Sequence, residues 1–586
     1  MSEALQPLTK KRIIVCCDGT WQNADNGYIK PTSSDPVPKL QIPSNVTRIS
    51  RCFKRRCSEG TFQIVYYQSG VGSRAGIIDR ILGGAFGLGI SENIREAYAY
   101  ICANYVDGDE IVLVGFSRGA FTARSIGGMI SDLGLLTREG MEHFYPVFKD
   151  MQNWMNPDYE DPFPNLPFSN KPKGDKAVDA YRQKLVENGY TRVRQEKGQG
   201  DFIKLSHKIE HAFHALALDE TRGPFSPTLW ERAEKCETLD LRQVWFPGSH
   251  ANAGGGWEDQ GVANTTLAWM MDQLSSVGLE FLSDALDRLF EENMQYYQNK
   301  KPNTSALEKC TSCCYGCQVK TGKLLWATNQ IFESNEPVRP WSLHAIRSVK
   351  SPIYDIAGCV TRSPGMYRKI DPKNGRPLKE FLKETNERIH SSVRVRLACE
   401  GLGVNDSDIW VCPALLKYWH PRRVADTFDD PVSKAATWGP QPAGIAPKVM
   451  DNPGMTDTKS STWPSNTQEP GSNPSDGLRW VWEYVGPENG APIVKTIVEE
   501  NIGPFEKHLL QLSEGNVQAF EYAENQDPTE FKAIQHKVLK KLKRSEKQQK
   551  KKPEHKKHGH QHRKTIESGE SGCEPSTTGS DESRKE

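Results

Sequence analysis

The sequence predicts an α/β fold with a mostly parallel, doubly wound sheet, helical insertions and a disordered, basic C-terminal tail. Three observations support this fold class. Short apolar runs rich in β-branched and aromatic residues alternate with segments of helical periodicity. Such runs end abruptly in small and polar residues, as Lys11–Cys17 does at Asp18, Gly19 and Thr20. Glu110–Val114 passes through one sharp turn directly into a helical pattern.

The predicted elements follow one another in the order expected of a sheet covered by helices. The predicted strands are Lys11–Cys17, Phe62–Tyr67, Glu110–Val114, Ala212–Leu218 and Gln243–Phe246. The predicted helices are Ile90–Tyr105, Ala120–Ile130 and Leu378–Leu397.

Composition divides the 586 residues into four parts. Residues 11–435 are expected to form the main domain, with a polar, Pro-rich insertion at about 142–200 that is a candidate lid. Residues 440–477 are dense in Pro, Gly, Ser and Thr and predict a flexible linker or long loop. Residues 478–530 regain apolar content, and 537–586 form a basic and polar tail that is expected to be disordered.

The distribution of charge bears on partners and compartment. The formal net charge is only +1, which argues against a surface that attracts nucleic acid or anionic lipid as a whole. The Lys/His-rich tract Lys537–Lys564 is the exception, and it is either a solvated tail or a contact for an anionic membrane or nucleic acid. No apolar run has the length of a transmembrane helix, and Met1–Lys10 lacks the apolar region of a signal peptide. A cytoplasmic location is expected, with the nucleus as an alternative through the basic tail.

Four of the fourteen cysteines form one dense run, Cys310, Cys313, Cys314 and Cys317. Zinc sites built from two C-x-x-C pairs normally have a longer loop between the pairs, so that four sulfurs converge on the metal. A surface loop with reduced or oxidisable thiols is therefore favoured over a zinc site. No metal and no cofactor is predicted.

The turn after Glu110–Val114 contains the candidate catalytic serine. Gly115-Phe116-Ser117-Arg118-Gly119 matches G-x-S-x-G between a strand and a helix, the context in which this motif presents a nucleophilic serine. Ser117 then needs a histidine to take its proton and a carboxylate to orient that histidine. Asp219 and His250 follow predicted strands in the chain order serine, acid, histidine, which is the order of α/β-hydrolases.

Three ordered motifs together resemble a known family. They are Cys17-Asp18-Gly19-Thr20-Trp21, the motif around Ser117, and Trp245-Phe246-Pro247-Gly248-Ser249-His250 followed by Gly254-Gly255-Gly256-Trp257. The chain resembles, over roughly Lys11 to Leu397, an α/β-hydrolase family of fungi and bacteria similar to the catalytic domain of type VI secretion phospholipase effectors of the first lipase class. One departure is Asn252, where relatives often have an aspartate that could serve a cation site.

The resemblance implies a serine esterase or lipase acting on an ester or lipid substrate, with phospholipid included. By this resemblance Ser117 is the nucleophile, Asp219 the orienting acid and His250 the general base. The N–H of Arg118 is expected to be one oxyanion donor, and the turn at Gly19 and Thr20 is the candidate for the second. Asp18 is expected to brace its turn rather than touch substrate. The alternative is a non-catalytic interaction protein that retains the hydrolase scaffold.

Overall fold

The computed structural model describes residues 10–19, 27–29, 31, 36–70, 88–174, 177–192, 209–232, 239–299, 339–348, 358–371, 376–406, 409–425, 478–531 and 540. The chain divides into one compact unit of residues 1–537 and a second of residues 538–586. The elements below all belong to the first unit. The cysteine run at 310–317, the predicted linker 440–477 and the basic tract apart from Lys540 lie outside the described residues.

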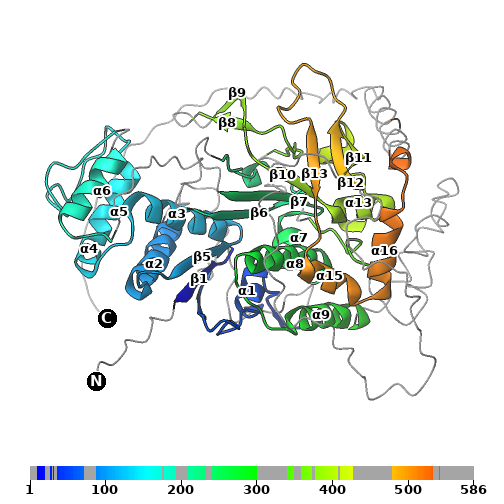
Figure 1. The fold of residues 1–586 in the computed structure, drawn as a ribbon, viewed down its shortest axis with the longest axis horizontal. Coiled ribbons are helices and arrows are strands. Elements are labelled where there is room, and N and C mark those ends of the chain that lie inside the picture. Colours follow the sequence, from blue (N-terminus) through cyan, green and yellow to red (C-terminus); the bar gives the residue numbers. More distant parts are fainter. Residues whose placement is uncertain are drawn as a thin grey trace, which may run out of the picture. The chain divides into compact units, whose positions relative to one another are not determined.

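The first sheet contains three parallel strands in the order β4-β1-β5, of which β1 and β5 are labelled in Figure 1. These are β1 (Lys11–Cys17), β4 (Phe62–Gln68) and β5 (Glu110–Gly115). Ile13 to Cys16 of β1 have no exposed surface, as a parallel strand covered on both faces requires. The three predicted strands of this half are therefore confirmed.

Helices cover both faces of β1, because its successive side chains point to opposite sides. Ile13 and Val15 share a core with helices α2 (Leu88–Asn104) and α3 (Arg118–Leu133). Ile14 and Cys16 belong to the other core, together with Val46 and Ile49 of α1 (Asn45–Ser50). This sheet is doubly wound, as predicted, and both predicted helices are present.

The expected insertion at 142–200 carries two of the helices that fill the first of these cores. After the short helix α4 (Arg138–Glu142) come α5 (Phe144–Asn153) and α6 (Ala177–Glu187). Phe148 and Tyr181 are buried there beside side chains of α2 and α3. The described part of the insertion is thus a packed helical layer.

The second sheet contains six strands in the order β11-β12-β13-β10-β7-β6. The strands β6 (His211–Ala217), β7 (Asp240–Phe246), β10 (Glu387–His390) and β13 (Thr496–Glu500) run parallel to their neighbours within this group. The strands β12 (Leu478–Tyr484) and β11 (Trp419–Ala425) extend the edge in antiparallel pairing. Residues 478–500 therefore complete the sheet that β6 and β7 begin.

Two features differ from a single, mostly parallel sheet. Among the described residues, ladder hydrogen bonds join the strands into two main sheets, with β5 at an edge of one and β6 at an edge of the other. Two short antiparallel ribbons stand apart, β2 (Tyr28–Ile29) with β3 (Lys39–Leu40), and β8 (Arg368–Ile370) with β9 (Pro377–Phe381).

The predicted helix Leu378–Leu397 is wrong over most of its length. Its first part lies in β9 and its middle forms β10, so that only α13 (Ser391–Ala398) is helical. Strand β10 is buried and pairs with β7 on one side and β13 on the other, so tertiary pairing overrides the helical pattern. The imidazole of His390 caps α13 by accepting from the Ser392 N–H, which marks where the helix can begin.

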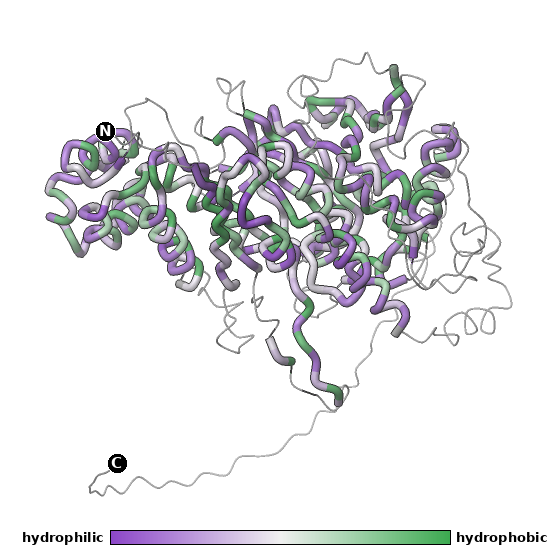
Figure 2. The backbone as a smooth tube through the Cα atoms, turned by 60° about the horizontal axis from the view of Figure 1, so that its bottom comes forward, coloured by the Kyte–Doolittle hydropathy of each residue, from purple (hydrophilic) through white to green (hydrophobic). Residues whose placement is uncertain are grey.

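The remaining helices pack around the second sheet. They are α7 (His250–Gly254), α8 (Gly261–Ser276), α9 (Ala285–Asn299), α14 (Pro413–Leu416), α15 (Pro504–Gln511) and α16 (Glu514–Glu524). Hydrophobic and hydrophilic positions interleave along the chain in Figure 2. Within the described part of the chain, no helix combines the length and the apolar character needed to cross a bilayer.

Candidate active site

Ser117 lies in the turn between β5 and α3 with a strained backbone. Its φ is 57° and its ψ is −124°, a conformation that non-glycine residues rarely adopt. The Phe116 N–H donates to the Cys17 carbonyl at 3.2 Å, which continues the pairing of β1 with β5 up to the turn. Such strain persists only where the surrounding structure enforces it, as in a nucleophile elbow.

Both glycines of the motif are required by close backbone approach. A Cβ at Gly115 would lie 2.5 Å from the Gly119 carbonyl oxygen, and a Cβ at Gly119 would overlap the carbonyl oxygen of Cys17. The turn can therefore fold tightly against the end of β1 only with glycine at these two positions.

The end of β1 lies directly against the serine. A Cβ built on Gly19 would be 3.4 Å from the Cβ of Ser117 and 2.9 Å from Cδ1 of Phe116. The structure thus brings the first and second sequence motifs together. The Gly19 N–H donates to Oδ1 of Asp18 at 2.6 Å, so in this structure it is used within the turn. Thr20 lies outside the described residues.

Asp18 braces the turn through several hydrogen bonds. Its buried carboxylate accepts from the hydroxyls of Ser44, Thr47 and Tyr67, each at 2.6 Å for the shortest contact. Ser44 is also the N-cap of α1 and accepts from the N–H groups of Val46 and Thr47. These bonds tie β1, β4 and α1 together beneath the elbow.

His250 is brought to the elbow by an aromatic contact. The ring of Phe116, the neighbour of Ser117, stacks on the imidazole of His250 with 4.7 Å between centroids. Phe225 approaches the same imidazole edge-on at 5.0 Å. Gly254 makes room for this arrangement, because a Cβ there would overlap the Phe116 ring. Gly254, the first glycine of the run after His250, is therefore required for the packing of Phe116.

The imidazole of His250 is neutral over a wide pH range. Burial lowers its pKa to about 4, with the charge of Glu220 acting against this shift and the charges of Arg222 and Arg362 contributing to it. Its buried Nε2 has no hydrogen-bond partner among the described residues. Among the described residues, the neutral imidazole thus has one ring nitrogen without a hydrogen bond, and that nitrogen is not bonded to the hydroxyl of Ser117.

Asp219 lies beneath the loop that carries His250. Its Oδ2 accepts from the Gly248 N–H at 2.7 Å, and its own N–H donates to the Gly248 carbonyl at 2.9 Å. Its Oδ1 accepts from the indole N–H of Trp410 at 2.8 Å. Burial raises the pKa of Asp219. The carboxylate is therefore linked to the His250 loop through the backbone of Gly248.

Glu220 is the second acidic group at this position. Its Oε2 accepts from the backbone N–H of His250 at 3.2 Å, and both of its oxygens are held by Arg222. Burial alone would raise the pKa of Glu220, but the hydrogen bonds and charge of Arg222 outweigh it and the pKa is lowered. Glu220 therefore places a negative charge beside His250.

Arg362 adds a buried positive charge near the same imidazole. Its guanidinium donates to the carbonyls of Arg222 and Phe225 and to the hydroxyl of Ser226. Burial lowers its pKa. Burial also lowers the pKa of Arg118, the first residue of α3, which follows the serine directly.

Asn252 has a structural role in this chain. Its Oδ1 accepts from Ser249 and from the Arg347 N–H, and its Nδ2 donates to the Ala345 carbonyl. The side chain closes the capping box of α7 and anchors residues 345–347 beside it. Its oxygen and nitrogen are thus both engaged within the protein.

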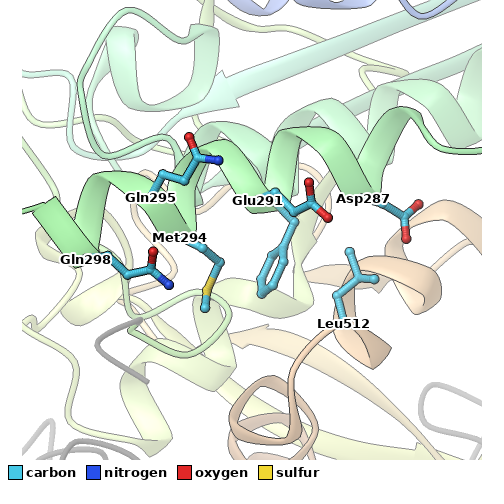
Figure 3. Close-up of a pocket in the computed structure, with 7 residues that line it drawn as sticks. Asp287, Glu291, Met294, Gln295, Gln298 and Leu512 are labelled. Carbon is cyan, nitrogen blue, oxygen red and sulfur yellow. The ribbon is translucent and has the colours of Figure 1, made fainter. Parts of the chain in front are cut away.

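Two other features lie apart from this site. Figure 3 shows a pocket on α9, lined by Asp287, Phe290, Glu291, Met294, Gln295 and Gln298 together with Leu512. Of the described residues, Cys57, Glu59 and Glu280 have ligand atoms close enough for a metal ion. Arg12 already bonds to Cys57 and Glu59, and Lys54 pairs with Glu280, so cations of the protein occupy that cluster.

Sequence reasoning missed the residues that join the motifs to one another. Phe116 occupies a variable position of G-x-S-x-G, and Gly254 belongs to a glycine run, so each carried a weak local signal. Trp410 lies 191 positions from Asp219 and no local pattern relates them. Glu220 follows Asp219 directly, and a search for every carboxylate near the predicted strand end would have included it.

Comparisons with known proteins agree with the motifs. Residues 11–273 match the family described as T6SS, phospholipase effector Tle1-like, catalytic domain. An uncharacterised protein of Saccharomyces cerevisiae (strain ATCC 204508 / S288c), YEL023C, is 26% identical over 242 residues, which is 37% of this chain and 32% of that protein. The chain thus spans about a third of the length of this curated relative.

A solved structure of the Tle1 effector bound to the VgrG spike from the type 6 secretion system is also similar. It is 16% identical, with 43% of this chain and 52% of that chain covered and a TM-score of 0.20, a value that carries no argument about the fold. The family match confirms the resemblance on which the roles were expected. The match to the family of T6SS phospholipase effector Tle1-like catalytic domains extends over residues 11–273.

Proposed function

We propose that this chain is a serine hydrolase that cleaves carboxylic esters of lipids, phospholipids included. Ser117 is the nucleophile, His250 the general base and Asp219 the orienting acid in this proposal. The observation that supports it most is the strained backbone of Ser117. Gly19 lies against the turn that contains Ser117, and the ring of Phe116 in the same turn stacks on His250. A strained serine beside a buried, neutral imidazole is the arrangement that acyl transfer needs.

The proposed chemistry proceeds through an acyl-enzyme. Oγ of Ser117 bonds to the ester carbonyl carbon while its proton passes to His250, and the imidazolium then gives that proton to the leaving alkoxide. Water attacks the acyl group by the same route in reverse and restores the hydroxyl. The low pKa of His250, about 4, keeps the base in its neutral form at neutral pH.

Developing negative charge on the carbonyl oxygen requires donors at the elbow. The N–H of Arg118 stands at the N-terminus of α3, where the helix dipole favours a negative charge. Thr20 remains the candidate for the second donor, because the Gly19 N–H is engaged by Asp18.

Asp219 supports His250 by holding the loop before it, and Glu220 supplies a charge beside it. The two bonds between Asp219 and Gly248 fix the backbone two residues before the imidazole. A carboxylate has about four lone-pair sites, so Asp219 retains acceptor capacity after its bonds to Gly248 and Trp410.

Labelling with a fluorophosphonate probe tests the proposal. The parent chain is expected to react and Ser117→Ala to lose the label, whereas Ser125→Ala, a change on the same helix, should label like the parent. A panel of short-chain esters and phospholipids run beside Ser117→Ala then gives the substrate class. Equal labelling of parent and Ser117→Ala would reject the nucleophile and favour a non-catalytic scaffold.

A further inference from the structure

The imidazole of His250 is contacted by two aromatic rings from different parts of the chain. Phe116 stacks on it from the elbow, with 4.7 Å between centroids and 28° between ring planes. Phe225 approaches it edge-on, with 5.0 Å between centroids and 69° between ring planes. Ring contacts of these two geometries are each favourable, so together they restrict the orientations open to the imidazole.

Ring contacts matter here because hydrogen bonds hold the backbone around His250 rather than its imidazole. Glu220 accepts from the His250 N–H at 3.2 Å, and Asp219 accepts from the Gly248 N–H at 2.7 Å. Nε2 of His250 has no hydrogen-bond partner in the described part of the chain. Backbone bonds leave the two side-chain torsions of a histidine undetermined, so the ring is oriented by what packs against it.

Phe225 is held in place by its own loop. It ends the short 3-10 helix Gly223–Phe225, and its N–H donates to the Arg222 carbonyl at 3.1 Å. The guanidinium carbon of Arg222 lies over the Phe225 ring, 3.7 Å from its centroid. The same guanidinium donates to both oxygens of Glu220, at 2.8 and 2.7 Å. The loop that carries Phe225 is thus joined to His250 both through its ring and through Glu220.

A later segment of the chain fixes this loop from outside. Arg222 pairs with Cys359 in an isolated antiparallel bridge. Arg362, with 3% of its surface exposed, donates to the carbonyls of Phe225 and Arg222 at 2.8 and 3.3 Å. This segment lies C-terminal to residues 11–273, which match the family. The position of Phe225 is therefore set in part by residues outside the matched span.

We propose that Phe225 is a positioning residue for the general base. Together with Phe116 it keeps the imidazole of His250 beside the turn of Ser117. The inference rests on the proposed function, because a positioned base is useful only where the serine gives up a proton. A ring held in advance need not be ordered in each catalytic cycle, so the contribution belongs to kcat rather than to substrate binding.

Hydrolysis of a soluble short-chain ester by the full chain tests this role. Phe225→Leu removes the ring, keeps apolar bulk, and should lower kcat about 10-fold with KM unchanged, the effect of one lost ring contact. Phe225→Tyr keeps the ring and should retain kcat within about threefold. The matched control is Phe163→Leu, since Phe163 is also half-buried and makes an edge-on contact, with Tyr145 at 6.1 Å. The control should have the parent's kcat.

The same substitution in a His250→Ala chain separates positioning of the base from general support of the fold. Without the imidazole Phe225 has nothing to position, so adding Phe225→Leu should leave the residual rate unchanged. An equal loss in the parent and in His250→Ala would overturn the inference, as would full kcat in Phe225→Leu. Thermal unfolding shows whether each variant is folded, and Phe225→Met removes the ring in a second way.

A measurement that needs no activity distinguishes failure of this inference from failure of the proposed function. Diethyl pyrocarbonate modifies neutral imidazoles, and peptide mass spectrometry gives the rate at His250. The reaction should be about 10-fold faster in Phe225→Leu, because the ring leaves its position more often, and unchanged in Phe163→Leu. Equal rates in the parent and Phe225→Leu would overturn the inference. Absence of ester hydrolysis in the parent would reject the proposed function, and the modification rates would then decide whether Phe225 holds the imidazole.

Discussion

The ring of Phe116 stacks on the imidazole of His250 with 4.7 Å between centroids and 28° between ring planes. Phe116, which precedes the proposed nucleophile Ser117, thereby contacts the proposed general base His250. The two motifs lie far apart in the chain, and this contact links them directly. Its energetic and catalytic consequences can be measured.

Removing the Phe116 ring should impair catalysis more than stability. In Phe116→Ala the imidazole loses a stacking partner worth about 1 kcal/mol and gains freedom to leave the elbow. A small misplacement of a catalytic group costs about 100-fold, so kcat/KM for a soluble ester should fall by that order. Phe62→Ala, at an exposed phenylalanine on β4, is the control and should keep the parent's activity. Equal activity in Phe116→Ala would show that the stack does not position the base.

Two glycines of the same helix should respond oppositely to alanine. A Cβ at Gly119 would overlap the end of β1, whereas one at Gly127 would meet its nearest atom at 3.6 Å. Gly119→Ala should lower the free energy of unfolding by about 3 kcal/mol through overpacking. Gly127→Ala should be neutral or raise it by up to about 1 kcal/mol through helix propensity. Urea unfolding measures both, and similar values for the two would contradict the packing of the elbow.

Paired substitutions decide which carboxylate serves His250. Asp219→Asn should lower kcat by several powers of ten if Asp219 orients the imidazole, because the amide favours the wrong tautomer. Glu220→Gln should lower it much less, since Glu220 contacts only the backbone N–H of His250. Single-turnover kinetics on one ester compares them. The reverse order of effects would transfer the role of the acid to Glu220.

The pH dependence of the reaction should reflect the low pKa of His250. Its neutral form is the active one, so kcat/KM should stay level from neutral pH downward and decline only as pH approaches about 4. Arg362→Met removes a positive charge that disfavours protonation, so the decline should move to higher pH. Arg362→Lys keeps the charge and should leave the profile in place. A decline near the ordinary histidine value in the parent would contradict a buried base.

Acid should destabilise the fold in part through buried histidines. Burial lowers the pKa of His214, His250 and His344 to about 4 each, so between about 6.5 and 4 the unfolded chain binds protons that the folded chain does not. Each histidine therefore removes about 1.4 kcal/mol of stability per pH unit as pH falls through this window. In His214→Gln the loss per unit should be smaller by that amount. Denaturant midpoints at several pH values provide the comparison, with His143→Gln, outside this group of three, as the control.

Local features of the fold could be predicted because short-range forces set them. Buried parallel strands such as Lys11–Cys17 are continuous apolar runs, and the steric demands of the elbow leave glycine at positions 115 and 119. The helical pattern of Leu378–Leu397 failed where burial between two other strands decided the conformation of Glu387–His390. Propensity is weaker than the gain from completing a buried sheet.

By itself the sequence determined the tight strand-to-helix turn at Ser117, the strand ends on which Asp219 and His250 stand, and the order of the three motifs. The tertiary structure decided how those motifs meet. It stacks Phe116 on His250 and places Glu220 beside the proposed base. It also directs the hydrogen bonds of Trp410 and Gly248 to the Asp219 carboxylate. The apolar side chains of the β2–β3 ribbon remain exposed. The physical reason is range: backbone sterics and periodicity act between near neighbours in the chain, whereas burial and hydrogen bonding select partners that only the folded chain brings together.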